Sequence, residues 1–339
     1  MKQTDFAYYL TKYLTEYLPG QRNVSSNTLR SYRDVMKQFL LYLNEKHKLK
    51  PEKICLTDIT SDVIVLYLEW LEKNRKVSIS TRNQRLAAIH SFFRYLQSEI
   101  PDILFESQKI LGIPFKKAHK EPVGYLEQVC IQSLLRQPDT RTIRGIRDCA
   151  ILVVLYDSAA RIQELIDLKV KDVRLTNPAT IKLTGKGNKT RIIPLMDKTS
   201  AIIESYMSML HLQDNGNQLM PLFYNSRIMP FTRPGITYIL KKYYKMAMDS
   251  DNSLPWKTKI HPHLLRHSKA VHMLEADVPL IYIRDYLGHV SITTTEIYLK
   301  TMNRLKREAL EKTYPQYVES IPPWSENKGL IEWLDGLCK

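Results

Sequence analysis

The stretch that most constrains this chain runs from residue 261 to residue 298. It begins with His-Pro-His-Leu-Leu-Arg-His at 261–267, continues to Leu-Gly-His at 287–289 and ends on Tyr298. Pro262 fixes the backbone just before a helix, so His263 and Arg266, three residues apart, are expected on one face of its first turn. A short helix would therefore hold a histidine and an arginine at a fixed distance from each other.

The end of this stretch predicts a turn followed by one more helix. Gly288 lets the chain turn sharply before His289, and Ser291 is placed to cap a last helix that presents Tyr298 outward. A tyrosine among arginines and histidines suits attack on a phosphodiester, because these side chains bind the charge that builds on the phosphoryl oxygens. The pattern therefore indicates chemistry on a phosphate ester.

Length and charge narrow the class of protein. A chain of 339 residues with 44% hydrophobic and 25% charged residues predicts two domains, or one domain with a large appendage. The 50 Lys and Arg against 35 Asp and Glu give a net charge of +15 and a pI near 9.5. This excess favours a nucleic acid partner over a membrane, since no basic amphipathic anchor stands out. A basic protein that binds no polyanion is the alternative.

Targeting and metal signals are absent from the sequence pattern. The first ten residues contain no apolar signal region, and the longest apolar run, 150–156, is too short to span a bilayer. The four cysteines form no Cys-x-x-Cys pair, which argues against a zinc site or a disulfide framework. We therefore expect a cytoplasmic protein with no cofactor, no bound metal and no membrane partner.

The N-terminal third predicts a small helical domain. Apolar residues recur at helical spacing in four segments, which are 6–17, 29–43 after the potential cap Asn27, 64–71 and 86–96. Their polar faces carry basic side chains that we expect to contact DNA phosphates and grooves: Arg30, Arg33, Lys37, Arg82 and Arg85. Solvated helix faces without a ligand are the alternative interpretation.

Residues 112–124 predict an extended, basic linker. Turn-forming residues stand at both ends, and Lys116 and Lys117 lie between them as further expected DNA contacts. The predicted organisation is therefore a helical DNA-binding domain at 1–111, this linker, a catalytic domain at 125–300 and a tail at 301–339.

A β-hairpin is predicted near the middle of the chain. Residues 179–184 and 190–195 alternate in hydrophobicity around the glycine-rich turn 185–189. Lys186 lies at the tip, where it can enter a groove beside a phosphate, although a lysine in a turn is most often solvated. Lys189 and Arg191 are further expected contacts with the DNA backbone. Upstream, 145–157 reads as an apolar helix that precedes Arg161 and Glu164.

Taken in chain order, these motifs resemble those of the tyrosine recombinases, the phage integrase superfamily. The resemblance covers residues 5–300 and rests on these positions: Arg161, Glu164, Lys186, His263, Arg266, His289 and Tyr298. It implies a mainly α fold with a small β-hairpin or sheet, in which a helical SAM-like core-binding domain precedes an α+β catalytic domain. The family usually has a glycine where this chain has Ala159. If that position needs a positive φ, alanine costs on the order of 1 kcal/mol.

The resemblance also assigns a role to each matched residue. Tyr298 would attack a DNA phosphate to form a 3′-phosphotyrosyl link. The other expected roles are as follows: Arg161 and Arg266 bind the non-bridging oxygens, Glu164 orients Arg161, His263 takes the tyrosine proton, His289 donates to the phosphate, and Lys186 protonates the leaving 5′ oxygen.

The partners implied by the resemblance are double-stranded DNA with inverted-repeat recombination sites and three further copies of the chain. The tail, through an apolar segment that includes Trp333, is expected to dock in trans within a tetramer on DNA; docking in cis on its own catalytic domain is the alternative. Accessory directionality factors or a sister recombinase are further expected partners, in a bacterial cytoplasm and near the nucleoid.

Several functions remain open at this point. Integration and excision, or transposition, of a mobile element is favoured because the tail is longer than a minimal resolvase needs. Xer-like resolution of chromosome or plasmid dimers is the first alternative. A type IB topoisomerase-like enzyme and a catalytically inactive architectural DNA-binding relative are the others.

Overall fold

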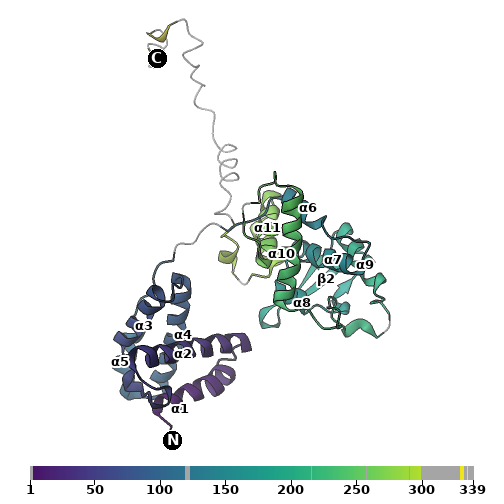
Figure 1. The fold of residues 1–339 in the computed structure, drawn as a ribbon. Helices are drawn as coiled ribbons and strands as arrows, with labels where there is room; N and C mark the ends of the chain where they lie inside the picture. Colours follow the sequence, from purple (N-terminus) through teal and green to yellow (C-terminus); the bar gives the residue numbers. More distant parts are fainter. Residues whose placement is uncertain are drawn as a thin grey trace. The chain divides into compact units, whose positions relative to one another are not determined.

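The computed structural model describes residues 3–118, 123–214, 216–256, 258–289, 291–298, 329–331 and 334, with Lys186 described by its backbone alone. The chain divides into two compact units, residues 1–120 and 121–339, which are drawn in Figure 1. Both units are mainly helical, and the second also contains a three-stranded antiparallel sheet. The predicted fold class is confirmed, while the predicted domain and linker boundaries stay a prediction.

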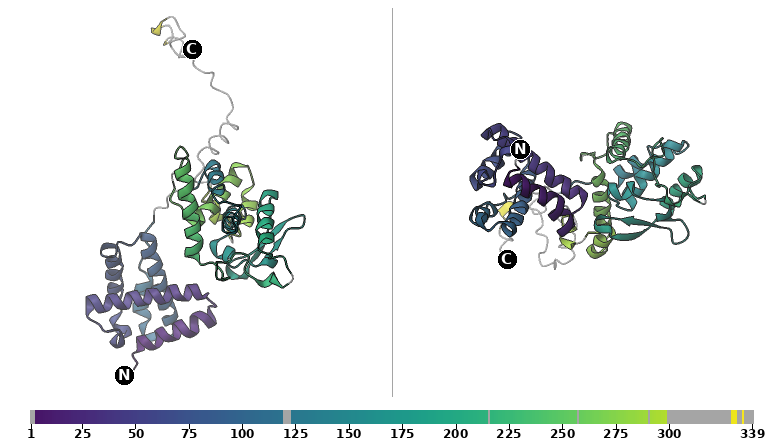
Figure 2. Two further views of the ribbon diagram at one scale, coloured as in Figure 1. Left: turned by 45° about the vertical axis from the view of Figure 1, so that its right-hand side comes forward. Right: turned by 90° about the horizontal axis from the view of Figure 1, so that it is seen from below.

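The N-terminal unit is a bundle of crossing helices. Its α-helices are α1 (Asp5–Lys12), α2 (Ser26–His47), α3 (Ser61–Lys73), α4 (Ile79–Glu99) and α5 (Leu104–Leu111), and a π-helix, Tyr13–Gln21, continues α1. Figure 2 shows α2 lying across α4. Tyr13, Phe92 and Tyr95 are almost fully buried and pack ring against ring at the centre of this bundle. Aromatic packing thus holds together helices that the apolar spacing predicts one by one.

Two local features of this unit concern a helix cap and the predicted linker. The cap of α2 is Ser25 and not Asn27, because Ser25 has the extended backbone of a cap and accepts the N–H of Thr28. The first part of the predicted linker packs on α4, where Asn83 exchanges two hydrogen bonds with the backbone of Lys116 at 2.7 and 3.1 Å. The segment up to Lys116 is therefore anchored to the N-terminal unit.

The second unit contains the remaining helices and the sheet. Its helices are α6 (Gln128–Leu135), α7 (Ile143–Asp157), α8 (Ile162–Ile166), α9 (Asp197–Met209), α10 (Arg233–Ser250), α11 (Pro262–Glu275) and α12 (Leu280–Leu287). Helix α7 lies at the centre and contacts α9 and α11 (Figure 1). Its residues 150–152 and 154–155 are fully buried, which explains the apolar run in the sequence. None of the helices among the described residues is both long and apolar enough to cross a membrane.

The predicted hairpin is confirmed. Strands β2 (Thr180–Thr184) and β3 (Thr190–Pro194) pair antiparallel with Ile181 opposite Ile193, and β1 (Val173–Arg174) pairs with the other edge of β2. Ile181 and Leu183 on β2 and Ile193 on β3 face the core, whereas the alternate residues Lys182 and Ile192 point to solvent. The turn contains Gly187 and Asn188 in left-handed conformations, which suits these two residue types.

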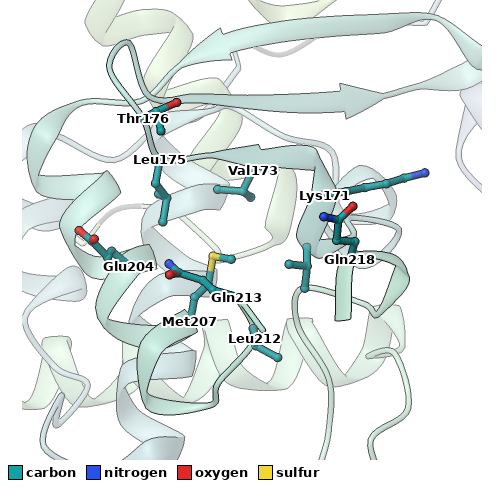
Figure 3. Close-up of a pocket in the computed structure, with 10 residues that line it drawn as sticks. Lys171, Val173, Leu175, Thr176, Glu204, Met207, Leu212, Gln213 and Gln218 are labelled. Atoms are coloured by element: carbon teal, nitrogen blue, oxygen red, sulfur yellow. The ribbon is translucent and has the colours of Figure 1, made fainter. Parts of the chain in front are cut away.

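A cavity lies beside β1 and the residues that follow it. It has a volume of about 520 Å³ and lies between the β1 region and α9, as Figure 3 shows. Apolar side chains such as Val173 and Met207 line it together with Lys171 and Glu204. Among the side chains that the structure describes, none of the predicted catalytic residues lines this cavity.

Candidate active site

The arginine that precedes α8 is held by an internal ion pair. Arg161 donates from Nη1 to Oε1 of Glu164 at 2.7 Å, and its backbone N–H donates to Oε2 at 2.9 Å. Arg191 on β3 binds the same carboxylate with two hydrogen bonds of 3.1 and 2.8 Å. Glu164 therefore orients two arginines that come from different parts of the fold.

The carboxylate of Glu164 stays ionised although it is 4% exposed. Burial by itself would raise the pKa of Glu164, but the hydrogen bonds and charges of Arg191 and Arg161 outweigh it and lower the pKa to about 2. The site is therefore arranged around one buried negative charge with two positive partners.

Arg266 on α11 is buried and aims at backbone carbonyls. Its guanidinium donates to the carbonyl oxygens of Ala159, at 2.7 Å, and of Leu287. Ala159 has a positive φ of 47°, so this position does require the conformation that glycine adopts with least strain. Burial, followed by repulsion from Arg161 and Arg191, lowers the pKa of Arg266 to about 9. The side chain remains protonated at neutral pH.

Gly288 makes the predicted sharp turn at the end of α12. Its φ is +63°, and an added Cβ would lie 3.2 Å from the side chain of Arg191. The carbonyl of Gly288 accepts a hydrogen bond of 3.3 Å from Nη2 of Arg161. Because Arg266 binds the preceding carbonyl of Leu287, both arginines meet at this one turn. The left-handed conformation of Gly288 thus gives the sharp turn before His289 that the sequence predicts.

The hairpin passes directly against the same ion pair. A Cβ added at Gly185 would lie 2.8 Å from Oε1 of Glu164 and 3.5 Å from Nη1 of Arg161. Only a residue without a side chain permits that approach. The next residue is Lys186, whose backbone therefore begins its turn beside Arg161.

His289 follows the turn and is fixed by hydrogen bonds with residues close to it in sequence. Its Nδ1 lies 2.9 Å from Oγ1 of the buried Thr295, and its backbone N–H donates to the carbonyl of Arg284. Burial, with the nearby charges of Arg266 and Arg161, lowers the pKa of His289 to about 4. The imidazole is therefore neutral at neutral pH in the protein without DNA.

Tyr298 is buried, so the prediction that it points outward is wrong. Ser291 does cap a turn, but this is the short 3₁₀ helix Ile292–Thr294. The ring of Tyr298 is 1% exposed and packs with a small apolar cluster that includes Val271 and Leu287. Burial raises the pKa of Tyr298, and the positive charges of Arg266 and Arg161 oppose this change.

The hydroxyl of Tyr298 contacts a histidine that the sequence analysis did not single out. Nδ1 of His267 lies 2.9 Å from the Tyr298 oxygen. No hydrogen bond joins Tyr298 to His263, the predicted proton acceptor, within the part of the chain that the structure describes. The ring centres of His263 and His261 lie 6.3 and 6.2 Å from that of His267. The only sequence signal for His267 was its place directly after Arg266.

Comparison with known proteins identifies two families that match this chain. Residues 125–304 match the Phage integrase family, and residues 11–99 match the Phage integrase, N-terminal SAM-like domain.

The chain belongs to the phage integrase family, whose members are tyrosine recombinases. It is 34% identical over 336 residues to y4rC of Sinorhizobium fredii, which bears the name integrase/recombinase, and this match covers 99% of both chains. It is also 34% identical over 289 residues to the tyrosine recombinase XerC of Herpetosiphon aurantiacus, covering 85% of this chain and 89% of the relative. This recombinase therefore belongs to a class of enzymes that break and rejoin DNA strands at specific sites.

A solved structure shows the same fold. The chain matches the XerH site-specific recombinase bound to a palindromic difH substrate in a post-cleavage complex, with a TM-score of 0.64 and 22% identity. The match covers 86% of this recombinase and 82% of that chain.

Two of the basic residues predicted to touch DNA, Arg191 and Arg82, are largely enclosed by other parts of this recombinase. All three donor nitrogens of Arg191 are used, by Glu164 and by the carbonyl of Tyr286. Arg82 is 6% exposed, donates to the carbonyl of Pro114 and lies near Glu72, so its expected place on an exposed face is wrong. Both side chains position other parts of the protein. The sequence could not show this from the positive charges alone, because segments from elsewhere in the chain pack over these two arginines.

The other predicted DNA contacts lie at the surface to differing degrees. Arg85 is half-buried and donates to Oε1 of Gln38 at 3.0 Å, and Lys116 is exposed but paired with Glu72 at 2.6 Å. The side chains that are exposed are Arg30, Arg33, Lys37, Lys117 and Lys189. Their contact with DNA stays a prediction.

Proposed function

We propose that Tyr298 attacks a DNA phosphate, forming a 3′-phosphotyrosyl link and releasing a 5′-hydroxyl. The observation that carries this proposal is the turn at Gly288, because Arg161 and Arg266 both donate to its backbone and His289 follows it. Tyr298 belongs to the cluster that packs under this turn through Leu287. The nucleophile and the positive groups thus come from one compact neighbourhood.

The two arginines suit the charge that develops during such an attack. A guanidinium remains protonated and presents several donors in one plane, which match the non-bridging oxygens of a pentacoordinate phosphorus. Glu164 fixes the plane of Arg161 before DNA arrives. A donor fixed in advance needs little reorganisation in the transition state, which is where electrostatic stabilisation lowers a barrier.

The same chemistry accounts for rejoining. The bond from phosphorus to the leaving 5′ oxygen is replaced by a bond to the tyrosine oxygen, so the phosphodiester is exchanged and not hydrolysed. The 5′-hydroxyl of a second strand then attacks the phosphotyrosine, and the tyrosine leaves. No nucleotide triphosphate is needed at either step.

Strand cleavage is expected to continue in excess EDTA and without nucleotide. The buried carboxylate among the described site residues, Glu164, is already bound by two arginines and has a pKa of about 2, so those arginines take the place that a cation would occupy. The measurement is covalent adduct formation on a nicked suicide substrate, resolved on denaturing gels. Loss of the adduct on chelation, with recovery in Mg²⁺, would contradict the proposed mechanism.

Lys186 is proposed as the acid that protonates the leaving 5′ oxygen. We expect Lys186→Ala to cleave an ordinary phosphodiester roughly 10²–10⁴-fold more slowly, and to recover when the bridging 5′ oxygen is replaced by sulfur, which leaves without a proton. Lys189→Ala is the matched control, because it removes an exposed lysine from the same turn. Its cleavage rate, divided by that of the wild type, should be the same on the two substrates. Equal defects of Lys186→Ala on both substrates would assign Lys186 to DNA binding.

For the biological role, we propose integration and excision, or transposition, of a mobile element. The relative named integrase/recombinase aligns over 336 residues and thus includes nearly all of the tail, whereas the XerC relative of H. aurantiacus covers 85% of this chain. That 34% identity to a XerC protein favours dimer resolution as the second candidate. Sequencing the DNA recovered from the covalent adduct distinguishes these two roles. A dimer-resolution site lies within the host chromosome or plasmid, whereas an integration or transposition site lies at the end of a mobile element.

We also infer that four copies assemble on paired DNA sites, with the tail of each copy docked on a neighbour. Leu330, Ile331 and Leu334 are exposed apolar side chains, and such a group favours a partner surface. Trp333, the residue predicted to insert into the neighbour, lies outside the described residues.

A further inference from the structure

The contact between His267 and Tyr298 concerns the first proton that the reaction must move. A neutral phenol with an ordinary pKa near 10 is a weak nucleophile at neutral pH, so the tyrosine has to lose its proton as it attacks. Nδ1 of His267 lies 2.9 Å from the Tyr298 oxygen, which is within the range for direct transfer. His263, in the position matched to the family motif, has no such contact within the described residues.

The backbone places His267 at this point for a clear reason. His267 lies four residues after His263 on α11, about one helical turn, and therefore one turn closer to the apolar cluster that holds the tyrosine ring. His263 is exposed at the start of the helix, whereas His267 is half-buried. The buried tyrosine thus meets the second of the two histidines.

We propose that His267 is the catalytic base that accepts the proton of Tyr298, and that His263 acts beside it on the phosphate side. This proposal rests on the proposed function, since it assigns one step of that reaction. As the tyrosine oxygen forms its bond to phosphorus, its proton passes to Nδ1 of His267, and the bond to the 5′ oxygen breaks as that oxygen takes a proton from Lys186, the acid proposed above. On rejoining, the departing tyrosine oxygen takes the proton back from His267.

Burial and nearby charges explain why the proton stays on Tyr298, and does not move to His267, when no DNA is bound. Burial, followed by repulsion from His263, His261 and Arg266, lowers the pKa of His267 to about 4. Burial raises the pKa of Tyr298, so the proton rests on the tyrosine and His267 is neutral at neutral pH. A neutral imidazole presents the lone pair that a base requires. A bound phosphate brings negative charge close to the histidines and the arginines, and this favours the imidazolium that the transfer creates.

The test uses His267→Asn in the full chain. Oδ1 of asparagine can occupy nearly the position of Nδ1 and accept a hydrogen bond from the tyrosine, but the amide does not take up a proton. We expect DNA binding to be retained and the rate of adduct formation to fall roughly 10²–10⁴-fold. The rate of the wild type should vary little with pH above neutrality. The rate of His267→Asn should rise about tenfold per pH unit, because the phenolate must then form by losing its proton to solvent.

His263→Asn is the matched variant on the same helix. It is expected to slow cleavage while keeping the weak pH dependence of the wild type. The opposite pattern, a steep pH profile in His263→Asn and a flat one in His267→Asn, would overturn the proposal and return the base to His263. Wild-type cleavage rates in His267→Asn would also overturn it. Absence of any adduct in the wild type would instead refute the proposed function itself.

A spectroscopic measurement keeps the proposal testable if His267→Asn fails to fold. Nitrogen NMR of the histidines in the full chain distinguishes a ring protonated on Nε2 from one protonated on Nδ1. We expect His267 at pH 6.5 to be neutral, with its proton on Nε2, and Tyr298→Phe to shift the Nδ1 resonance. An Nδ1–H tautomer or a protonated ring at that pH would contradict the role of base.

Discussion

Replacing Tyr298 with phenylalanine is expected to abolish covalent attachment to DNA while DNA binding stays near that of the wild type. The substitution removes the nucleophilic oxygen and one hydrogen bond to His267, which is worth about 0.5–1.5 kcal/mol. The ring itself is kept in its cluster, so the fold should persist. Denaturing gels on a nicked suicide substrate measure the adduct, and mobility shift measures binding.

Tyr286→Phe is the matched control for this result. Its hydroxyl donates to the carbonyl of Asp157, and its backbone carbonyl accepts from Arg191, so it is a half-buried tyrosine close to the site with an internal role. We expect Tyr286→Phe to form the adduct. An adduct that survives Tyr298→Phe would mean that another of the 20 tyrosines is the nucleophile.

The second large effect is expected from Glu164→Gln. This change leaves Arg161 and Arg191 without their shared negative partner, in a site that also holds Arg266. Removing one partner of a buried pair is destabilising by roughly 3–5 kcal/mol, because the remaining charges are left uncompensated. Adduct formation should fall with it, since the plane of Arg161 is no longer fixed. Urea unfolding at neutral pH measures the stability and the suicide substrate measures the cleavage.

The ion pairs of Glu164 should also make the stability of the folded protein fall at acid pH. The pKa of Glu164 falls from an ordinary 4.5 to about 2 in the folded protein. Its contribution is therefore present above about pH 4.5 and is lost as the pH falls toward 2, by about 3 kcal/mol. Glu164→Gln should lack this part of the acid destabilisation. The control Asp285→Asn alters an exposed ion pair with Arg284 and should change stability little. An unchanged acid profile in Glu164→Gln would contradict the account.

Features that depend on a few neighbouring residues could be predicted from the sequence. The hairpin follows from alternation around a glycine-rich turn, and the start of α11 follows from Pro262. The left-handed turn at Gly288 follows from the one residue type that adopts it without strain. Each of these is decided by local backbone preference.

Features that depend on packing between distant segments could not be predicted. His261, His263 and His267 lie within seven residues, and the tyrosine that selects among them is 31 residues from His267. The choice depends on how the chain returns after Gly288, which periodicity does not encode. In the same way, the exposure of Arg82 depends on a segment that docks more than 30 residues later in the chain.

The central claim is that a DNA strand becomes bonded through its 3′ phosphate to Tyr298. The most direct measurement traps the adduct on a suicide substrate, digests both protein and DNA, and identifies the modified peptide by mass spectrometry. The account predicts a peptide that contains Tyr298 and carries a nucleotide through a 3′-phosphotyrosyl bond. A nucleotide attached through its 5′ phosphate, or attached to any other residue, would contradict it.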